Sequence, residues 1–215
     1  MAGELRPDEQ LKSTAQLMAE YEASNPTIQR ATDILKSEGF LYSQRGKGIF
    51  VRNKQPFIVD VSAYFAPAPD GYTYQMVEVA EVEPPAEVAE LFGLGKGGTA
   101  ILRQRITLHQ GEPVELCYSY YPIDLVAGTP IAEEGRIRGG APKVLEDLGF
   151  PEVRFEDQVS ARMPTSEEIE LLDLPEVPVI RQFRIMYSTN DRPVEVSALI
   201  KGGHLYELRY HQAVS

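Results

Sequence analysis

The chain has 215 residues, of which 43% are hydrophobic, and a formal net charge of −11. This length suits one large domain or two small ones with buried cores. The sequence has no apolar run long enough to cross a membrane and no signal-peptide core. Its single cysteine, Cys117, excludes an intrachain disulfide and fits a reducing compartment. These properties predict a cytoplasmic protein and argue against the membrane and secreted classes.

A first helix is predicted within residues 3–23. Ser13 or Thr14 can cap its N-terminus by accepting a hydrogen bond from a free backbone amide. The apolar side chains at helical spacing are those of Leu17, Met18 and Tyr21. The segment is therefore expected to form one amphipathic helix.

A second helix is predicted to begin near Ser24 and to end at Gly39. Ser24 or Asn25 can cap the first amides, and Pro26 suits the first turn because its missing N–H would have no partner there. Gly39 can adopt the left-handed conformation that ends a helix. The apolar side consists of Ile28, Ala31, Ile34 and Leu35, which leaves the opposite side polar.

A basic hairpin is predicted after this helix. Phe40 and Tyr42 on one side, and Ile49 and Val51 on the other, alternate with other residues around the turn at 45–48. A polar-faced helix followed by a basic hairpin is typical of the recognition helix and wing of a winged helix-turn-helix. Any small α+β unit is the structural alternative.

The charge of the chain is unevenly divided. Residues 1–54 carry eight Lys and Arg against seven Asp and Glu, a net +1, and residues 55–215 carry thirteen against twenty-five, a net −12. The two sums give the total of −11. Basic charge near the second helix and its hairpin suits an approach to DNA, whereas the acidic remainder would repel DNA and favour a different partner.

Residues 54–74 show no sustained hydrophobic periodicity and are predicted to form a linker. An internal repeat follows them. Each copy, at 84–122 and at 164–200, contains a short helix and a β-hairpin, and Arg105 and Glu115 of the first correspond to Arg184 and Glu195 of the second. Two such copies predict a mostly antiparallel sheet with pseudo-twofold character. Their helices, with another over 143–148, are expected to cover one face.

One face of the predicted sheet is polar, because side chains alternate between faces along a strand. Its members are Arg103, Arg105, Thr107, Glu115, Cys117, Ser119, Tyr121, Glu195, Ser197 and Lys201. In one interpretation this face lines a pocket in which Arg105 binds an anionic or carbonyl group and Glu195 accepts from hydroxyls or amines. In the other it is a solvated face on which Arg105 pairs with Glu115 or Glu195.

Residues 3–52 resemble the DNA-binding domain of GntR-family bacterial regulators. The matching motifs are GELRP-x-x-QL-x-ST, L-x-x-x-Y-x-x-SNPT-x-Q-x-A, L-x-x-EG and RGKG-x-FV. The resemblance implies a helix in the major groove and a wing at the minor groove or the backbone. The residues that it places at DNA are Ser24, Asn25, Thr27, Gln29 and Arg30 on the helix and Arg45 and Lys47 on the wing. Their side chains suit reading base edges and holding phosphates.

Three departures from the family pattern bear on DNA binding. The family's first helix is missing, Lys12 and Ala15 stand where the family has a proline and an arginine, and Glu22 stands at a common turn glycine. The predicted winged helix-turn-helix is therefore partial. Two hypotheses stay open: a ligand-responsive DNA-binding transcriptional regulator, expected to act as a repressor, and a small-molecule-binding protein of the same family that has lost DNA binding.

Residues 60–212 resemble the UTRA effector-binding domain of the HutC-type branch of this family, through the motifs ILRQRI, GEPVELCYSYYP, LEDLG and RPVEVS. The resemblance implies a fold like chorismate lyase that binds a small effector between the sheet and its loops. Arg105 and Glu195 match usual effector contacts, whereas Thr107, Cys117 and Lys201 depart from the pattern of sugar-phosphate sensors. The predicted effector-binding residues are Arg103, Arg105, Thr107, Glu115, Cys117, Glu195 and Lys201.

The predicted fold class is α+β, with a winged helix-turn-helix over 1–53, a linker over 54–74 and a UTRA domain over 75–213. We expect a homodimer that binds double-stranded operator DNA and a small-molecule effector, with no cofactor, no metal and no catalytic residue. An enzyme is a third alternative, supported only by the lyase-like fold. The three histidines, which are scattered and predicted to be exposed, are His109, His204 and His211.

Overall fold

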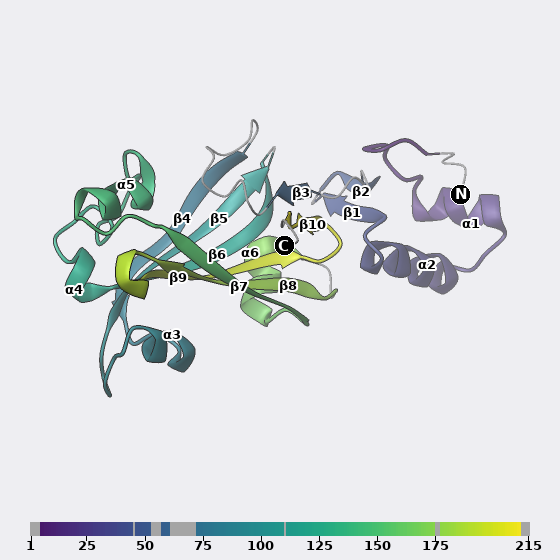
Figure 1. The fold of residues 1–215 in the computed structure, drawn as a ribbon. Coiled ribbons are helices and arrows are strands. Elements are labelled where there is room, and N and C mark those ends of the chain that lie inside the picture. Colours follow the sequence, from purple (N-terminus) through teal and green to yellow (C-terminus); the bar gives the residue numbers. More distant parts are fainter. Residues whose placement is uncertain are drawn as a thin grey trace. The chain divides into compact units, whose positions relative to one another are not determined.

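The computed structural model describes residues 5–44, 46–52, 57–60, 72–109, 111–174 and 177–211. The chain divides into two compact units, whose elements are labelled in Figure 1. The first unit holds residues 1–65, 174–178 and 202–215, and the second holds residues 66–173 and 179–201. Of the helices in these described ranges, none is both long and apolar enough to cross a membrane.

The N-terminal part of the first unit contains the two predicted helices and the hairpin. Helix α1 (Thr14–Tyr21) begins with a capping box, in which Ser13 Oγ accepts from the Gln16 amide and the Gln16 side chain accepts from the Ser13 amide. The next elements are α2 (Asn25–Ser37), β1 (Leu41–Gln44) and β2 (Gly48–Val51). The two strands pair antiparallel, and Gly39 has a φ of 72° just after α2. The predicted helices, glycine stop and hairpin are confirmed.

The apolar side of α2 is less buried than its sequence predicts. Ile28 is buried, but Ile34 is 47% and Leu35 is 38% exposed, and Tyr21 of α1 is 64% exposed. Thr32 takes a buried position instead, because its hydroxyl donates to the Ile28 carbonyl oxygen at 2.8 Å. Within the described residues, α1 and the hairpin therefore cover only part of this helix.

The predicted linker contains regular structure, so that prediction was wrong in part. Strand β3 (Phe57–Asp60) pairs in parallel with β10 (Tyr206–Arg209), and β4 already begins at Tyr72. A four-residue strand shows too little periodicity to be recognised, and its partner lies near the other end of the chain. Residues 54–56 and 61–71 of the predicted linker lie outside the described residues.

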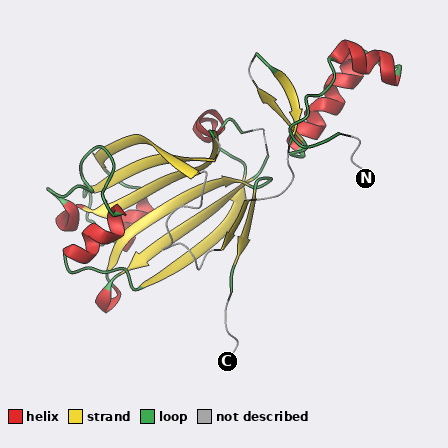
Figure 2. Cartoon of the chain, turned by 90° about the horizontal axis from the view of Figure 1, so that it is seen from above, coloured by secondary structure: helices red, strands yellow, loops and turns green. Residues whose placement is uncertain are grey.

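The second unit is built on a six-stranded sheet with the strand order β4-β5-β6-β9-β8-β7 (Figures 1 and 2). Its strands are β4 (Tyr72–Val82), β5 (Ala100–His109), β6 (Glu112–Pro122), β7 (Arg154–Arg162), β8 (Val179–Tyr187) and β9 (Pro193–Gly202). Helix α3 (Ala86–Leu91) follows β4, and α6 (Ser166–Leu172) follows β7. The copies β4-α3-β5-β6 and β7-α6-β8-β9 meet at the antiparallel β6–β9 pair. The predicted repeat and its pseudo-twofold arrangement are confirmed.

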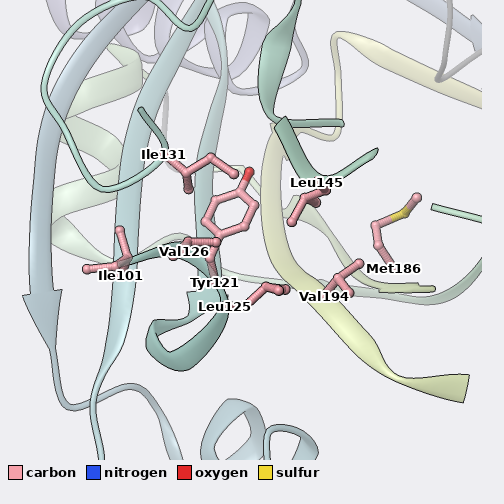
Figure 3. Packing of buried hydrophobic residues seen from close by; sticks show 8 residues of the cluster. All are labelled: Ile101, Tyr121, Leu125, Val126, Ile131, Leu145, Met186 and Val194. Atoms are coloured by element: carbon pink, nitrogen blue, oxygen red, sulfur yellow. The ribbon is translucent and has the colours of Figure 1, made fainter. Parts of the chain in front are cut away.

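Helices cover both faces of this sheet, so the prediction of a single covered face was wrong. Val88 of α3 packs with Leu102 and Tyr120 on one face. On the other face, the short helix α4 (Ile123–Val126) and α5 (Gly140–Asp147) pack against a cluster that includes Ile101 and Tyr121. These two residues adjoin Leu102 and Tyr120 in sequence and therefore point to the opposite face. That second cluster, in which Figure 3 shows the Tyr121 ring near the middle, consists of Ile101, Tyr121, Leu125, Val126, Ile131, Leu145, Met186 and Val194.

Truncation of the core should cost much more than truncation of the surface of the same helix. Leu145 of α5 is fully buried, whereas Leu148 at the C-cap of this helix is 39% exposed. We expect Leu145→Ala to lower the free energy of unfolding by about 2–5 kcal/mol, and Leu148→Ala to change it by roughly 0.5 kcal/mol or less. Urea denaturation of both variants measures this, and equal losses would contradict the assignment of the core.

Candidate functional site

The predicted polar residues come together on the face of the sheet that also carries the Tyr121 cluster. The strand register places Arg103 opposite Ser119 and Ser119 opposite Ser197. Four residues along β5, Thr107 is opposite Glu115, and Glu115 is opposite Lys201. We call the set the polar row: Arg103, Arg105, Thr107, Glu115, Cys117, Ser119, Glu195, Ser197 and Lys201. The prediction that β5, β6 and β9 present these residues together is confirmed.

Most of the polar row is buried. Arg103, Thr107, Cys117, Ser119, Glu195, Ser197 and Lys201 are each exposed by 5% or less. The alternative of a solvated sheet face is therefore wrong for these strands. Buried charged groups are costly unless they are paired and hydrogen-bonded, so the partners of each charge show how the row is held.

Lys201 and Glu115 form the central ion pair of the row. Lys201 Nζ lies 2.7 Å from Glu115 Oε2 and also donates to Gln182 Oε1 at 3.0 Å. Thr107 Oγ1 donates to the other oxygen of Glu115 at 3.1 Å. Burial alone would raise the pKa of Glu115, but the charge and hydrogen bond of Lys201, together with Arg105 and Thr107, outweigh it and hold that pKa below its ordinary value.

Arg105 occupies the half-buried end of the row beside β4. Its guanidinium lies 5.9 Å from the centre of the Tyr74 ring, which is 59% exposed. Cys117, opposite Arg105 on β6, places its Sγ 3.4 Å from Ser119 Oγ. Burial raises the pKa of the Cys117 thiol, although the charge of Arg105 acts in the opposite direction. Cys117 is therefore a neutral lining group and not a thiolate.

Arg103 has a structural partner that the sequence did not reveal. Its Nη1 donates to the carbonyl oxygens of Ile131 at 2.8 Å and Glu133 at 2.7 Å, and its Nη2 donates to that of Gly135 at 2.8 Å. Burial lowers the pKa of this guanidinium. Arg103 thus anchors the loop at 130–135 over the sheet, and an effector contact at this side chain would compete with these bonds.

Three polar residues of β7 and β8 extend the row, and the sequence reasoning did not include them. Arg184 binds Asp157 through two hydrogen bonds of 2.7 Å, and Gln182 donates to the same carboxylate at 2.9 Å. Arg184 corresponds to Arg105 in the repeat, which was an available signal. Asp157 carried none, because the edge strand β7 shows no apolar alternation that would assign its faces.

Glu195 of the polar row and Glu152 beside it differ in whether they have hydrogen-bond partners. Ser119 Oγ lies 2.8 Å from Ser197 Oγ, and Ser197 donates to Glu195 Oε1 at 2.5 Å. Glu152, just before β7, has both carboxylate oxygens buried without a hydrogen-bond partner among the described residues. Burial and the nearby charge of Glu195 raise the pKa of Glu152 to about 8, against a smaller lowering by Arg184. Sequence reasoning missed Glu152, which lies in a loop without periodicity.

The first unit presents the predicted DNA-contact residues on its surface. Ser24, Asn25, Thr27, Gln29 and Arg30 are exposed around the N-terminus of α2, and Lys47 is exposed on the hairpin. The hydroxyl groups of Ser24 and Thr27 form a hydrogen bond, with 2.9 Å between Ser24 Oγ and Thr27 Oγ1. The first turn of α2 has no acidic residue, so its positive end is available to phosphate. The remaining predicted contact, Arg45, lies outside the described residues.

His204 contradicts the prediction of exposed histidines. Both ring nitrogens are buried without a hydrogen-bond partner among the described residues. A side chain added at Gly39 would meet His204 at 3.0 Å. Burial, together with the charge of Arg52, lowers the pKa of His204 to about 4. The described ranges contain no group of three or more His, Cys, Asp or Glu side chains placed to hold a metal ion.

Comparison with known proteins decides the family. The sequence profile of bacterial regulatory proteins of the gntR family matches residues 1–51, and the profile of the UTRA domain matches residues 70–207. The chain belongs to the GntR family and carries a UTRA domain. Its organisation fits the HutC type, and it is a ligand-responsive, DNA-binding transcriptional regulator of the α+β class. GntR regulators bind operator DNA and small-molecule effectors.

Several known proteins are similar to this chain over most of its length. An uncharacterised HTH-type transcriptional regulator of Streptomyces coelicolor is 29% identical over 237 residues, which cover 97% of this chain and 86% of that protein. The HTH-type transcriptional repressor NagR of Bacillus subtilis is 24% identical over 216 residues, covering 95% and 86%. The crystal structure of PhnF from Mycobacterium smegmatis has a TM-score of 0.65 at 15% identity, covering 99% and 95%, and supports the fold.

Stability should depend on pH through Glu152. Its pKa of about 8 in the folded protein lies above the ordinary 4.5, so the folded state binds more protons than the unfolded chain between these values. Stability must therefore fall as pH rises through this window. We expect Glu152→Gln to flatten the decline of Tm between pH 5 and 8 and to raise Tm by several degrees at pH 8, since about 1 kcal/mol corresponds to roughly 2–4 °C at this size.

The control for this measurement is Glu146→Gln, which removes a carboxylate that is 61% exposed on α5. Its Tm should follow the pH dependence of the unmodified protein. A decline of equal slope in Glu152→Gln would show that this carboxyl group does not titrate in the stated window.

Proposed function

We propose that this regulator is a homodimeric, cytoplasmic repressor whose effector binds on the polar row of the UTRA sheet. The observation that carries the proposal is the burial of so many charged and hydrogen-bonding side chains on one sheet face. Well-packed apolar residues of similar volume are often at least as stable as a buried ion pair, so a charged core favours a task other than folding. The proposed effector-binding residues are Arg105, Thr107, Glu115, Cys117, Glu195 and Lys201.

Each part of the row has a chemical role in this proposal. Arg105 is half-buried beside the exposed Tyr74 ring, which suits the capture of an anionic or carbonyl group. Lys201 pairs with Glu115 and can exchange this mutual hydrogen bond for one to a ligand. Arg103 positions the 130–135 loop that covers the ligand. Cys117, the only cysteine, is held as a thiol, which supports binding and not catalysis at this face.

In the same proposal, the winged helix-turn-helix at residues 1–53, which we call the head, contacts DNA. The exposed N-terminus of α2 enters the major groove with Gln29 and Arg30, and Lys47 holds backbone phosphate beside it. A twofold dimer presents two such heads to the half-sites of a pseudo-palindromic operator. Effector binding then favours a dimer geometry in which the two heads no longer match the half-site spacing, and the operator is released.

Operator binding should depend on α2 and on the wing. We expect Arg30→Ala to weaken binding to the DNA upstream of the regulator's own gene about tenfold or more, because a base contact contributes roughly 1–3 kcal/mol. Lys47→Ala should lower the slope of log affinity against log salt by about 1. Arg138→Ala, an equal charge change at an exposed position of the second unit, is the control. Fluorescence anisotropy at two salt concentrations measures all three.

Absence of binding by the unmodified protein at both salt concentrations would favour the alternative of a ligand-binding protein without DNA binding. Binding that does not change with salt would contradict a phosphate-contacting head, because release of counterions makes specific binding salt-dependent.

Ligand binding should depend on Arg105. In a thermal-shift screen of metabolites, we expect compounds that raise the Tm of the unmodified protein to bind at least about tenfold more weakly to Arg105→Ala, since a charge-assisted hydrogen bond contributes roughly 1.5–3 kcal/mol. Arg192→Ala, which removes an exposed arginine paired with Asp124, is the control. Equal shifts in both variants would place the ligand elsewhere.

A further inference from the structure

Glu152 is a buried carboxyl group without a structural partner. It lies in the loop between α5 and β7, both of its carboxylate oxygens are buried, and neither accepts a hydrogen bond from a described residue. A native protein rarely keeps such a group, because leaving a buried acceptor unsatisfied costs free energy. The group calls for an explanation beyond the packing of the domain.

The charges around Glu152 do not supply that partner. Glu195, which is 3% exposed, has the same sign and already accepts from Ser197. Arg184 is the cation that acts on Glu152, but its charge is shared with Asp157 through two hydrogen bonds. Counted as ionised, Glu195, Asp157 and Arg184 sum to a net charge of −1, and the sum becomes −2 when Glu152 loses its proton above its pKa of about 8. The end formed by β7, β8 and β9 is therefore acidic.

The opposite end of the row is basic. On β5, Arg103 and Arg105 carry two positive charges, of which Arg103 is satisfied by neutral carbonyl oxygens and not by a carboxylate. Lys201 and Glu115 form a neutral pair at the level of Thr107, which lies beyond Arg105 from Glu195. Strands β5 and β9 lie two strand spacings apart, about 10 Å, with β6 between them. The register sets Arg105 level with Leu199, which is four residues, or roughly 13 Å, along β9 from Glu195. The backbones that carry the opposite charges are thus about 16 Å apart, and the long side chains extend into this gap.

We propose that the effector is zwitterionic: a cationic amine lies between Glu152 and Glu195, and an anionic group lies at Arg105. This inference rests on the proposed effector site and names the class of ligand that the site takes. An ammonium group donates three hydrogen bonds, which suits two neighbouring buried carboxylates whose nearby cation, Arg184, is shared with Asp157. Binding near neutral pH also releases a proton from Glu152, because the pKa of this carboxyl is raised to about 8 before the amine arrives.

The test uses a series of ω-amino acids with a defined charge separation: 4-aminobutanoate, 6-aminohexanoate and 8-aminooctanoate. Octanoate and octylamine, each with one charge, are the matched probes. We expect the longer zwitterions to raise the Tm of the full chain more than octanoate or octylamine does at equal millimolar concentration. In Glu152→Gln this additional shift should fall to the level given by octanoate.

Two controls separate the outcomes. Glu156→Gln, which removes a 52% exposed carboxylate from β7, should keep the full zwitterion shift. The melting curve of Glu152→Gln without ligand shows that this variant is folded. A zwitterion shift that is no larger than that of octanoate, or that persists in Glu152→Gln, overturns the proposed amine site. Neither result decides whether the polar row binds the effector, because the comparison of Arg105→Ala with Arg192→Ala tests that separately. Operator binding is also measured separately.

Discussion

The antiparallel pairing of β6 with β9 is the constraint on which the UTRA domain depends. It joins the two copies of the repeat, and its register sets Glu115 opposite Lys201 and Ser119 opposite Ser197. Glu115 and Lys201 form an ion pair across these two strands, and Ser119 and Ser197 form a hydrogen bond across them. A shift of one residue would turn these side chains to the opposite face, where Tyr120 and Val196 pack with α3.

The same sheet face combines two kinds of environment. Near Tyr121 and Leu145 it is apolar and covered by α4 and α5, which supplies burial of hydrocarbon surface. Farther along the strands it carries charges that cost free energy to bury and that are only partly balanced within the protein. The apolar end offsets the cost of the polar end, so the domain can retain groups such as Glu152, for which we propose a ligand as the partner.

Much of this architecture could be predicted from sequence because its signals are local or repeated. The capping residue Ser13, the stop at Gly39 and the matched hairpins around Arg105 and Arg184 each gave a correct element or face. The remainder depends on partners distant in sequence. The β3–β10 pair, the carbonyl contacts of Arg103 and the isolation of Glu152 arise only when segments far apart along the chain meet. Helix α2 shows the opposite case, since a clear apolar stripe did not guarantee burial of Ile34.

The central claim is that the polar row is the place where the effector binds. A crystal structure of the UTRA domain within the full chain, with a bound metabolite selected by its effect on operator affinity, tests this most directly. The account predicts ligand density on the Arg105 face of the sheet, with polar contacts to Arg105 and to at least one of Glu115, Glu195 and Lys201. Density on the opposite face, against α3 and α6, or in the N-terminal head would contradict it.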